Sequence, residues 1–388
     1  MDSATLSGPD WPYVLDLLPS DLEESAVSKL AMVRKRGITS AADLLRLCLA
    51  YACCDFSLRQ VASQAALLGT ASISDVAVMK RLQKAGDWLG YLVVRFLQER
   101  GLAAPDAPFR VRVVDATTVS EPGSQGTDWR LHVGLDLARQ QISSVELTGP
   151  AEGETFRRHT VAPGEIVLGD RGYAHRRGLA HILAQQAHVV VRFSGQNLPL
   201  QTRQGHPLDP LVVLQTLQPG EIGDWPVQFE SDAQTYPMRL VALRKSAAAA
   251  AQEERRMRRD ASRKSRRVSA KALQAAHFVY LLTDLGADEA PADQVLELYR
   301  LRWQIEIVFK RLKSLLHLDH LRAKNPELAR AYLYAKILGA LLVEELACSS
   351  LSFFPWGYRL SPQGRQSLAL AADTSATPAG RGQGCADD

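Results

Sequence analysis

The sequence predicts an α/β protein with a mostly helical N-terminal part, and two observations indicate this class. Residues 1–105 carry apolar side chains at helical spacing, with serines in positions to cap the helices. From Phe109 onward the spacing changes, and short β-rich runs alternate with helical segments. The chain has 388 residues, of which 46% are hydrophobic and 23% charged. It is therefore long enough for one large domain or two to three ordinary ones with a real core.

The N-terminal part predicts three successive helices. Ser40 caps the first of them, residues 41–52, and Ser57 caps the second, which Gly69 ends. Ser74 or Asp75 starts the third. Two helices around a glycine-containing break resemble a helix-turn-helix, whose second helix would enter a DNA major groove. Many helical bundles share this pattern, so both interpretations stay open.

Two aspartates follow β-rich runs. The run Phe109–Val114 leads directly into Asp115, and two more alternating runs, 131–137 and 142–147, complete a predicted meander. A later short strand, 165–169, is followed by Asp170. Each aspartate alone is an ordinary acid at a strand end that caps a turn. Together they form a pair of carboxylates that neighbouring strands would bring side by side.

Residues 194–243 read as a small all-β insertion, because glycines and prolines separate short runs that we expect to be strands: 211–217, 225–229 and 238–243. A basic segment follows. Between Arg244 and Lys271, eleven Lys and Arg face three acids, a local charge of +8 in a chain of net +4. Such a segment favours a polyanionic partner, although a solvated linker is the plain alternative. Its central arginines are Arg255, Arg256, Arg258 and Arg259.

The stretch 299–313 predicts an amphipathic helix with two distinct stripes. The buried stripe consists of Leu298, Leu301, Ile305, Val308, Leu312 and Leu315. The second stripe consists of Tyr299, Arg302, Glu306 and Lys313. At about 100° per residue, the members of the second stripe fall within roughly 60° of one another. The plain interpretation is an exposed face with an i,i+4 pair between Arg302 and Glu306.

Asp115, Asp170 and Glu306 together predict a metal site. Three acids at one point raise each other's pKa, and hard divalent cations relieve that crowding. We therefore expect Mg²⁺ or Mn²⁺, with two ions that activate a water or a 3′-hydroxyl and stabilise the leaving oxygen of a phosphodiester. The sequence has no His/Cys cluster that suggests zinc, and no Walker loop or GxGxxG motif after a strand.

These residues resemble the DDE transposases of bacterial insertion sequences, in the group with a YREK signature and a β-rich insertion before the glutamate. Tyr299, Arg302, Glu306 and Lys313 have the spacing of that signature. Residues 170–173 (DRGY) resemble the second aspartate motif, and residues 115–117 (DAT) the first. The resemblance covers roughly residues 20–358.

The resemblance implies an RNase H-like mixed-sheet catalytic core with Asp115, Asp170 and Glu306 as metal ligands. It implies that Tyr299, Arg302 and Lys313 contact DNA phosphates, and that Trp225 stacks on a flipped base, although an aromatic residue in a β insertion is more often part of the core. Its partners would be double-stranded DNA, both transposon ends and target, within a homodimeric synaptic complex that works through a DNA hairpin.

The expected domain boundaries are as follows: residues 1–105, a helical DNA-binding domain; 106–193, the first part of the RNase H-like core; 194–275, the β-rich insertion with the basic segment; 276–358, the second part of the core; and 359–388, a disordered tail. The five cysteines show no disulfide framework and the N-terminus shows no signal peptide. We therefore expect a cytoplasmic protein without a membrane span, and the resemblance implies that it is bacterial and nucleoid-associated.

The predicted function is that of a transposase that binds inverted repeats at transposon ends and catalyses metal-dependent cut-and-paste transposition. One alternative is a catalytically degenerate copy that binds DNA and inhibits transposition. Another is a structure-specific nuclease that cuts without joining ends.

Overall fold

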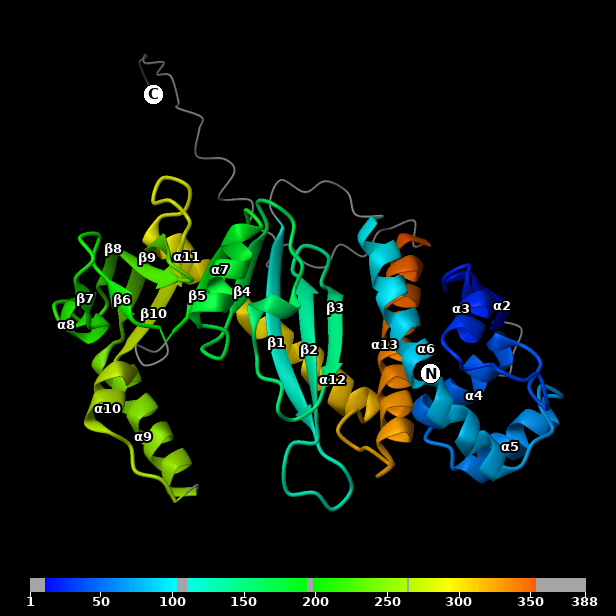
Figure 1. Ribbon diagram of the computed structural model, residues 1–388. Coiled ribbons are helices and arrows are strands. Elements are labelled where there is room, and N and C mark those ends of the chain that lie inside the picture. The colour runs from blue at the N-terminus through cyan, green and yellow to red at the C-terminus, as the bar shows by residue number, and fades with distance from the viewer. Residues whose placement is uncertain (1–10, 103–109, 194–197, 264, 354–388) are drawn as a thin grey trace, which may run out of the picture. The chain divides into compact units, whose positions relative to one another are not determined.

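A computed structural model describes residues 11–102, 110–193, 198–263 and 265–353 (Figure 1). The chain divides into two compact units, Met1–Leu342 and Val343–Asp388. Apart from the C-terminal part of α13, the features below lie in the first unit. The predicted tail, 359–388, lies outside the described residues.

The N-terminal part is helical, as predicted. Its helices are α2 (Trp11–Asp16), α3 (Leu22–Ser28), α4 (Ala41–Cys53), α5 (Leu58–Leu67) and α6 (Asp75–Leu102). Ser40 accepts a hydrogen bond from the backbone of Asp43, and Ser57 forms a capping box with Gln60, so both predicted caps are confirmed. However, α6 has 28 residues, whereas the second helix of a helix-turn-helix is short. It also buries Leu82, Trp88 and Leu92 in the core.

In the described part of the chain, ten strands form one sheet in the order β3-β2-β1-β4-β5-β10-β9-β8-β6-β7. β1 pairs in parallel with β4, and β4 with β5, while the other pairs are antiparallel. The strands are β1 (Val111–Val119), β2 (Trp129–Asp136), β3 (Gln141–Thr148), β4 (Ile166–Gly169), β5 (His188–Arg192), β6 (Leu200–Gln201), β7 (Pro207–Leu208), β8 (Ile222–Ser231), β9 (Gln234–Arg244) and β10 (Phe278–Thr283).

The remaining helical elements lie between and after these strands. They are η1 (Phe156–Arg158), α7 (Arg176–Ala184), α8 (Pro210–Leu214), α9 (Ala247–Arg263), α10 (Ala270–Ala276), α11 (Ala292–Arg300), η2 (Leu301–Trp303), α12 (Gln304–Leu316) and α13 (Pro326–Phe353). The mixed sheet with its helices confirms the predicted α/β class.

The prediction that the first strand ends at Asp115 is wrong. β1 continues to Val119, and Asp115 pairs with Val133 in the middle of the β1–β2 ladder. The residues after Asp115 include Thr117, Thr118 and Val119, which are β-branched and suit a strand that has a partner along its whole length.

Two hydrophobic clusters cover opposite faces of the sheet. Val113 and Leu168 belong to the cluster that includes Ile305 and Val308 of α12, together with the N-terminal helices. Val114 and its neighbours on that face belong to the cluster that includes α7. In Figure 1, α12 runs behind β1 and β2, whereas α7 lies in front of the sheet. Because side chains alternate along a strand, Asp115 shares the face of Val113, on which α12 packs.

The insertion extends the core sheet, because β9 pairs with β10 and β10 with β5. Predicted strands at 225–229 and 238–243 fall within β8 and β9, whereas the predicted strand at 211–217 is wrong. Helix α8 forms there, since Asp209 accepts a hydrogen bond from the backbone of Leu211 and Pro210 occupies the first helical position. The basic segment forms α9, whose residues other than Ala250 are not buried.

The predicted single helix of residues 299–313 is instead α11, a 3₁₀ turn η2 and α12 in succession. Ile305, Val308 and Leu312 are buried as predicted, but Leu315 is 73% exposed, so the buried stripe ends one turn early. Helix α12 ends at Leu316, where His317 adopts a left-handed conformation. The buried Lys336 of α13 donates to the carbonyls of Leu316 and His317 and so satisfies this helix end.

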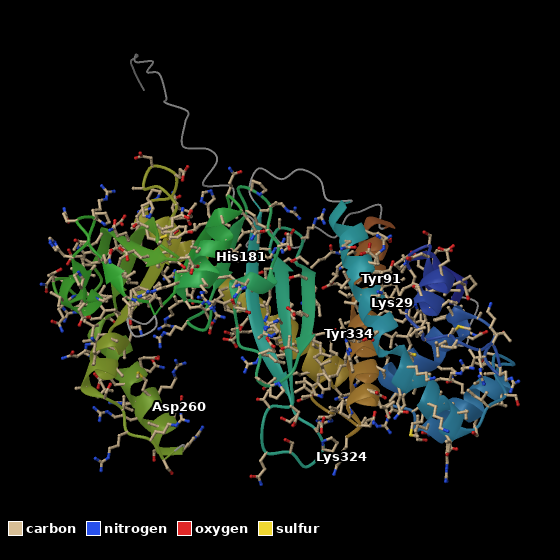
Figure 2. The ribbon with its side chains drawn as sticks, in the orientation of Figure 1. Lys29, Tyr91, His181, Asp260, Lys324 and Tyr334 are labelled. Carbon is tan, nitrogen blue, oxygen red and sulfur yellow. The ribbon has the colours of Figure 1, made fainter. Side chains whose placement is uncertain are left out.

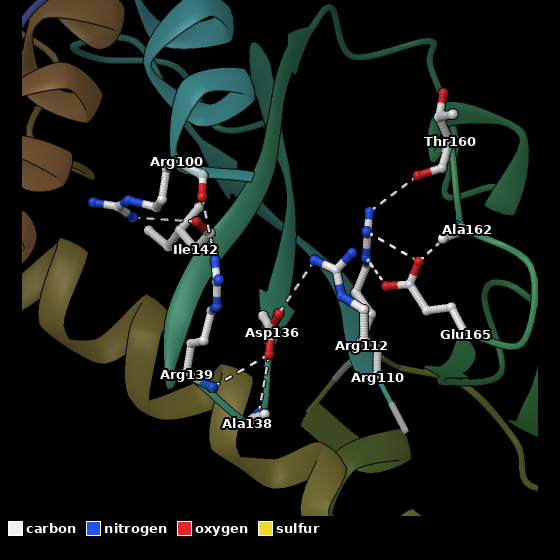
Figure 3. A network of polar contacts seen from close by, with 10 residues as sticks. All are labelled: Arg100, Arg110, Arg112, Asp136, Ala138, Arg139, Ile142, Thr160, Ala162 and Glu165. Carbon is white, nitrogen blue, oxygen red and sulfur yellow. Dashed lines mark hydrogen bonds and ion pairs between the residues drawn. The ribbon is translucent and has the colours of Figure 1, made fainter. Parts of the chain in front are cut away.

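An ion pair joins β1 to the start of β4 (Figure 3). Arg112 donates through Nε and Nη2 to both oxygens of Glu165, at 2.7 and 3.2 Å, and through Nη1 to the carbonyl of Thr160. Glu165 also accepts from the backbone of Ala162. The two side chains are 11% and 3% exposed, so this pair, which we call the register clamp, is largely shielded from solvent.

Replacing Glu165 with Ala should lower the free energy of unfolding by about 3–5 kcal/mol, because it leaves the Arg112 guanidinium buried without a counter-charge. Urea denaturation measures the change. The matched control is Glu297→Ala, which breaks an exposed pair with Arg300 and should change stability little. Equal losses in both variants would contradict the importance of the register clamp.

Candidate active site

The register clamp places two predicted site residues level with each other. In the β1–β4 pair, Val111 lies opposite Ile166 and Val113 opposite Leu168. Two residues further along both chains, this register brings Asp115 level with Asp170, which directly follows β4. Neighbouring strands lie about 4.8 Å apart, so the two aspartates are close neighbours across the end of β4.

Asp115 is a half-buried carboxylate at the centre of the site. Its side chain is 15% exposed, and Oδ1 accepts a 2.8 Å hydrogen bond from the backbone of Ala116. The pKa of Asp115 is raised to about 6, chiefly by burial and in addition by the charges of Asp170 and Glu306, while the Ala116 hydrogen bond and Arg302 act to lower it. Both other predicted acids therefore act on Asp115 electrostatically.

Arg302 connects Asp115 to Glu306. Its Nη1 lies 3.2 Å from Asp115 Oδ2, and its Nη2 lies 2.9 Å from Glu306 Oε1. The guanidinium also lies 6.0 Å from the ring centre of Tyr299. Arg302 is 20% exposed and Glu306 62% exposed, so the bridge runs from the buried floor of the site to solvent.

Asp170 is fixed by the turn that follows it. Its Oδ1 accepts a 2.8 Å hydrogen bond from the backbone of Gly172. Tyr173, the last residue of the same motif, is fully buried and packs against Phe156 with ring centres 5.0 Å apart. The buried ring of Tyr173 thus anchors the turn that holds the Asp170 carboxylate in place.

The structure brings Asp115, Asp170, Glu306, Arg302 and Tyr299 together. The other predicted contacts lie elsewhere. Lys313 is seven residues beyond Glu306, about 10 Å further along α12. Trp225 is half-buried on β8, where its ring packs over Gly223 and against the second hydrophobic cluster.

The four predicted arginines lie on α9, which Figure 2 marks by Asp260. All four side chains are exposed. Arg256 and Arg258 pair with Glu253 and Glu254 of the same helix, at 2.7 and 3.7 Å. The basic segment is therefore an exposed helix of the insertion, separate from the cluster around Asp115.

The carboxylates suit a hard divalent cation by their chemistry, since all are oxygen donors in a site with excess negative charge. Within the described residues, no three His, Cys, Asp or Glu side chains are near enough to one another to hold an ion. The positive charge between Asp115 and Glu306 is the guanidinium of Arg302. Cation binding at all three acids thus requires Arg302 to give up at least one of these contacts.

Sequence reasoning did not single out Glu154, a fourth carboxylate at this place. Burial raises its pKa, and so do the charges of Asp170 and Asp115. Glu154 precedes η1 and belongs to none of the recognised motifs. Only the folded structure therefore shows that it lies near Asp115 and Asp170.

The chain belongs to a known family: residues 106–342 match the family described as Transposase DDE domain. The matched region contains β1, which carries Asp115, and α12, which carries Glu306. It also contains β4, which Asp170 directly follows.

Individual relatives agree with the family. The chain is 39% identical over 355 residues to the putative transposase InsL for insertion sequence element IS186A of Escherichia coli (strain K12), covering 89% of this chain and 96% of that protein. It is also 39% identical over 356 residues to the transposase for IS421 of Escherichia coli, with the same coverage. Identity to the transposase for IS231F of Bacillus thuringiensis subsp. israelensis is 29% over 277 residues, covering 63% and 57% of the two chains.

These matches confirm the predicted family, the RNase H-like fold class and the enzyme class of a DNA-cleaving and strand-transferring transposase. DNA is therefore the partner, and divalent metal dependence is a general property of the family. None of the described helices meets the length and hydropathy that a bilayer crossing requires.

Replacing Asp115 with Asn should stabilise the metal-free protein at pH 8. Because the pKa of Asp115 rises from 3.8 to about 6 on folding, the folded state holds the proton more tightly, and stability falls as the pH rises through this window. The stabilisation at pH 8 is up to about 3 kcal/mol, at about 1.4 kcal/mol per pKa unit, and should vanish below pH 4.

Urea denaturation in EDTA at pH 8 and pH 3.5 measures this difference. The control is Asp288→Asn on an exposed loop residue. A difference between wild type and Asp115→Asn that stays constant with pH would contradict the raised pKa.

Proposed function

We propose that this transposase cuts and joins DNA at transposon ends with Asp115, Asp170 and Glu306 as metal ligands and Mg²⁺ or Mn²⁺ as the cofactor, bound as two ions. Bound there, the ions would supply an activated water or 3′-hydroxyl and charge neutralisation at the leaving oxygen. The observation that carries the proposal is the Arg302 bridge: Arg302 pairs with Asp115, which lies 187 residues earlier in the sequence, and also with Glu306.

Arg302 has two roles in this proposal. Without DNA and cations it neutralises the carboxylates that would otherwise repel one another. When cations take over that role, its guanidinium turns to phosphates beside the scissile bond, for which its forked donors are well suited. Tyr299 and Lys313, on the same side of the α11–α12 segment, extend the phosphate contacts along the DNA.

The exposed arginines of α9, namely Arg255, Arg256, Arg258 and Arg259, provide a second DNA contact. Such side chains bind phosphates without reading sequence. Trp225 remains a candidate for base stacking, although its half-buried ring already has partners within β8 and the second hydrophobic cluster.

The wider assignment rests on the family. We propose that the substrates are terminal inverted repeats and target DNA, that the reaction is cut-and-paste through a hairpin intermediate, and that a homodimer forms the synaptic complex. The expected location is the bacterial cytoplasm, at the nucleoid. Residues 1–105 would bind DNA, 106–193 and 276–358 would form the catalytic core, and 194–275 would form the insertion.

The alternative of a degenerate inhibitory copy gains no support from the matches, which are to transposases. The presence of the three proposed ligands and of the Arg302 bridge also argues against it. A nuclease that cuts without joining ends would yield no strand-transfer products from pre-cleaved transposon ends, whereas a transposase yields them.

Asp115→Asn, Asp170→Asn and Glu306→Gln should each reduce Mg²⁺-dependent cleavage of transposon-end DNA at least a thousandfold, because each removes a proposed metal ligand. Binding to the same DNA in a gel-shift assay should persist. The control Glu297→Gln removes an exposed acid one turn before Arg302 and should cleave normally. Full cleavage by any of the three site variants would refute the assignment.

Replacing all four α9 arginines with Ala should flatten the salt dependence of DNA binding. If each arginine neutralises one phosphate, the slope of log K against log salt falls by about 3–4 in magnitude. The matched control replaces the same arginines with Lys, which keeps the charge and should keep the slope. An unchanged slope in the Ala variant would mean that α9 does not touch DNA.

A further inference from the structure

Glu154 is held against the catalytic turn by its neighbour Phe156. The Phe156 side chain is fully buried, and it lies so close to Gly169, the last residue of β4, that a Cβ at Gly169 would lie 2.6 Å from Phe156 Cζ. On its other side it packs against Tyr173. The segment that carries Glu154 is therefore fixed to both ends of the turn that presents Asp170.

The carboxylates of Glu154 and Asp170 meet at Gly172. A Cβ built on Gly172 would lie 1.8 Å from Glu154 Oε2 and 3.2 Å from Asp170 Oδ1. Because both distances start from one point, the two oxygens are at most about 5 Å apart. Two ligands on opposite sides of a Mg²⁺ ion are about 4 Å apart, so this pair is within the range that one ion can bridge with small side-chain movements.

Gly172 has no backbone reason to be glycine. Its φ is outside the left-handed region that favours glycine. What a side chain would meet there is the Glu154 carboxylate. The residue type at position 172 thus matches the presence of an acid at position 154.

The side chains around Glu154 carry a net negative charge that a cation could neutralise. Its Oε1 lies 3.5 Å from Arg130 Nη1, on β2 opposite Thr118 of β1. Four carboxylates, those of Asp115, Asp170, Glu306 and Glu154, then face two guanidinium groups, Arg302 and Arg130. The remaining two negative charges equal the charge of one divalent ion.

We propose that Glu154 is a fourth acidic ligand of the catalytic centre, which holds a divalent cation together with Asp170. This inference rests on the proposed function. Arg130 holds the Glu154 carboxylate in place while no cation is bound, and Gly172 provides the space in which the two acids approach each other.

Glu154→Gln keeps the shape of the side chain and removes its charge. In the full-length protein bound to transposon-end DNA, Mn²⁺ affinity measured by electron paramagnetic resonance should fall at least tenfold, with an unchanged thermal unfolding midpoint. The control Glu152→Gln removes a more exposed acid two residues away, which pairs with Arg158, and should bind Mn²⁺ like wild type.

Two outcomes are distinguishable. If wild type binds no Mn²⁺, the proposed metal-dependent function fails as a whole. If wild type binds Mn²⁺ and Glu154→Gln binds it equally well, only the role of Glu154 is overturned.

Gly172→Ala gives a second, independent test, because the added Cβ displaces the Glu154 carboxylate without straining the backbone. It should weaken Mn²⁺ binding about as much as Glu154→Gln, and the double variant should be no weaker than either single variant. Fully additive losses would show that the two residues act separately and would contradict the contact on which the inference depends.

Discussion

The parallel register between β1 and β4 is the constraint on which the cluster of Asp115, Asp170 and Arg302 depends. A shift by one residue would turn Asp115 to the opposite face of the sheet, away from α12 and Arg302. The register clamp of Arg112 and Glu165 opposes such a shift, since Arg112 lies within β1 and Glu165 directly precedes β4. A shielded ion pair at one end of the strands thus determines where two acids meet at the other end.

The sequence predicted well what depends on local spacing. Ser40 and Ser57 cap helices as expected, because capping is decided within four residues. Arg302 and Glu306 pair at the predicted i,i+4 spacing for the same reason. Predictions failed where contacts with residues far away in the sequence determine the length of an element. β1 runs past Asp115 because β2 pairs with its whole length. Leu315 is exposed in the last turn of α12, which ends at Leu316 where Lys336 of α13 binds the free carbonyls.

The site itself was only partly predictable. Three acids could be chosen from motifs, and the i,i+4 pair between Arg302 and Glu306 follows from their spacing. Neither the contact of Arg302 with Asp115 nor the approach of Glu154 to Asp170 has a signature in the sequence. Both depend on contacts between residues far apart in the chain, and the space at Gly172 is visible only once the turn is folded. Local patterns therefore identify the reactive groups, while the tertiary fold decides which charges balance them.

The continuous sheet has a consequence for where along a bound DNA duplex cleavage would occur. Hydrogen-bonded strands lead without interruption from β4, beside Asp170, through β5 and β10 to β9, and α9 begins three residues after β9 ends. If α9 binds DNA as proposed, the sheet fixes the distance between the bound duplex and the proposed site of cleavage. Changing the length of the short connection between β9 and α9 would move the grip along the duplex while leaving the chemistry in place.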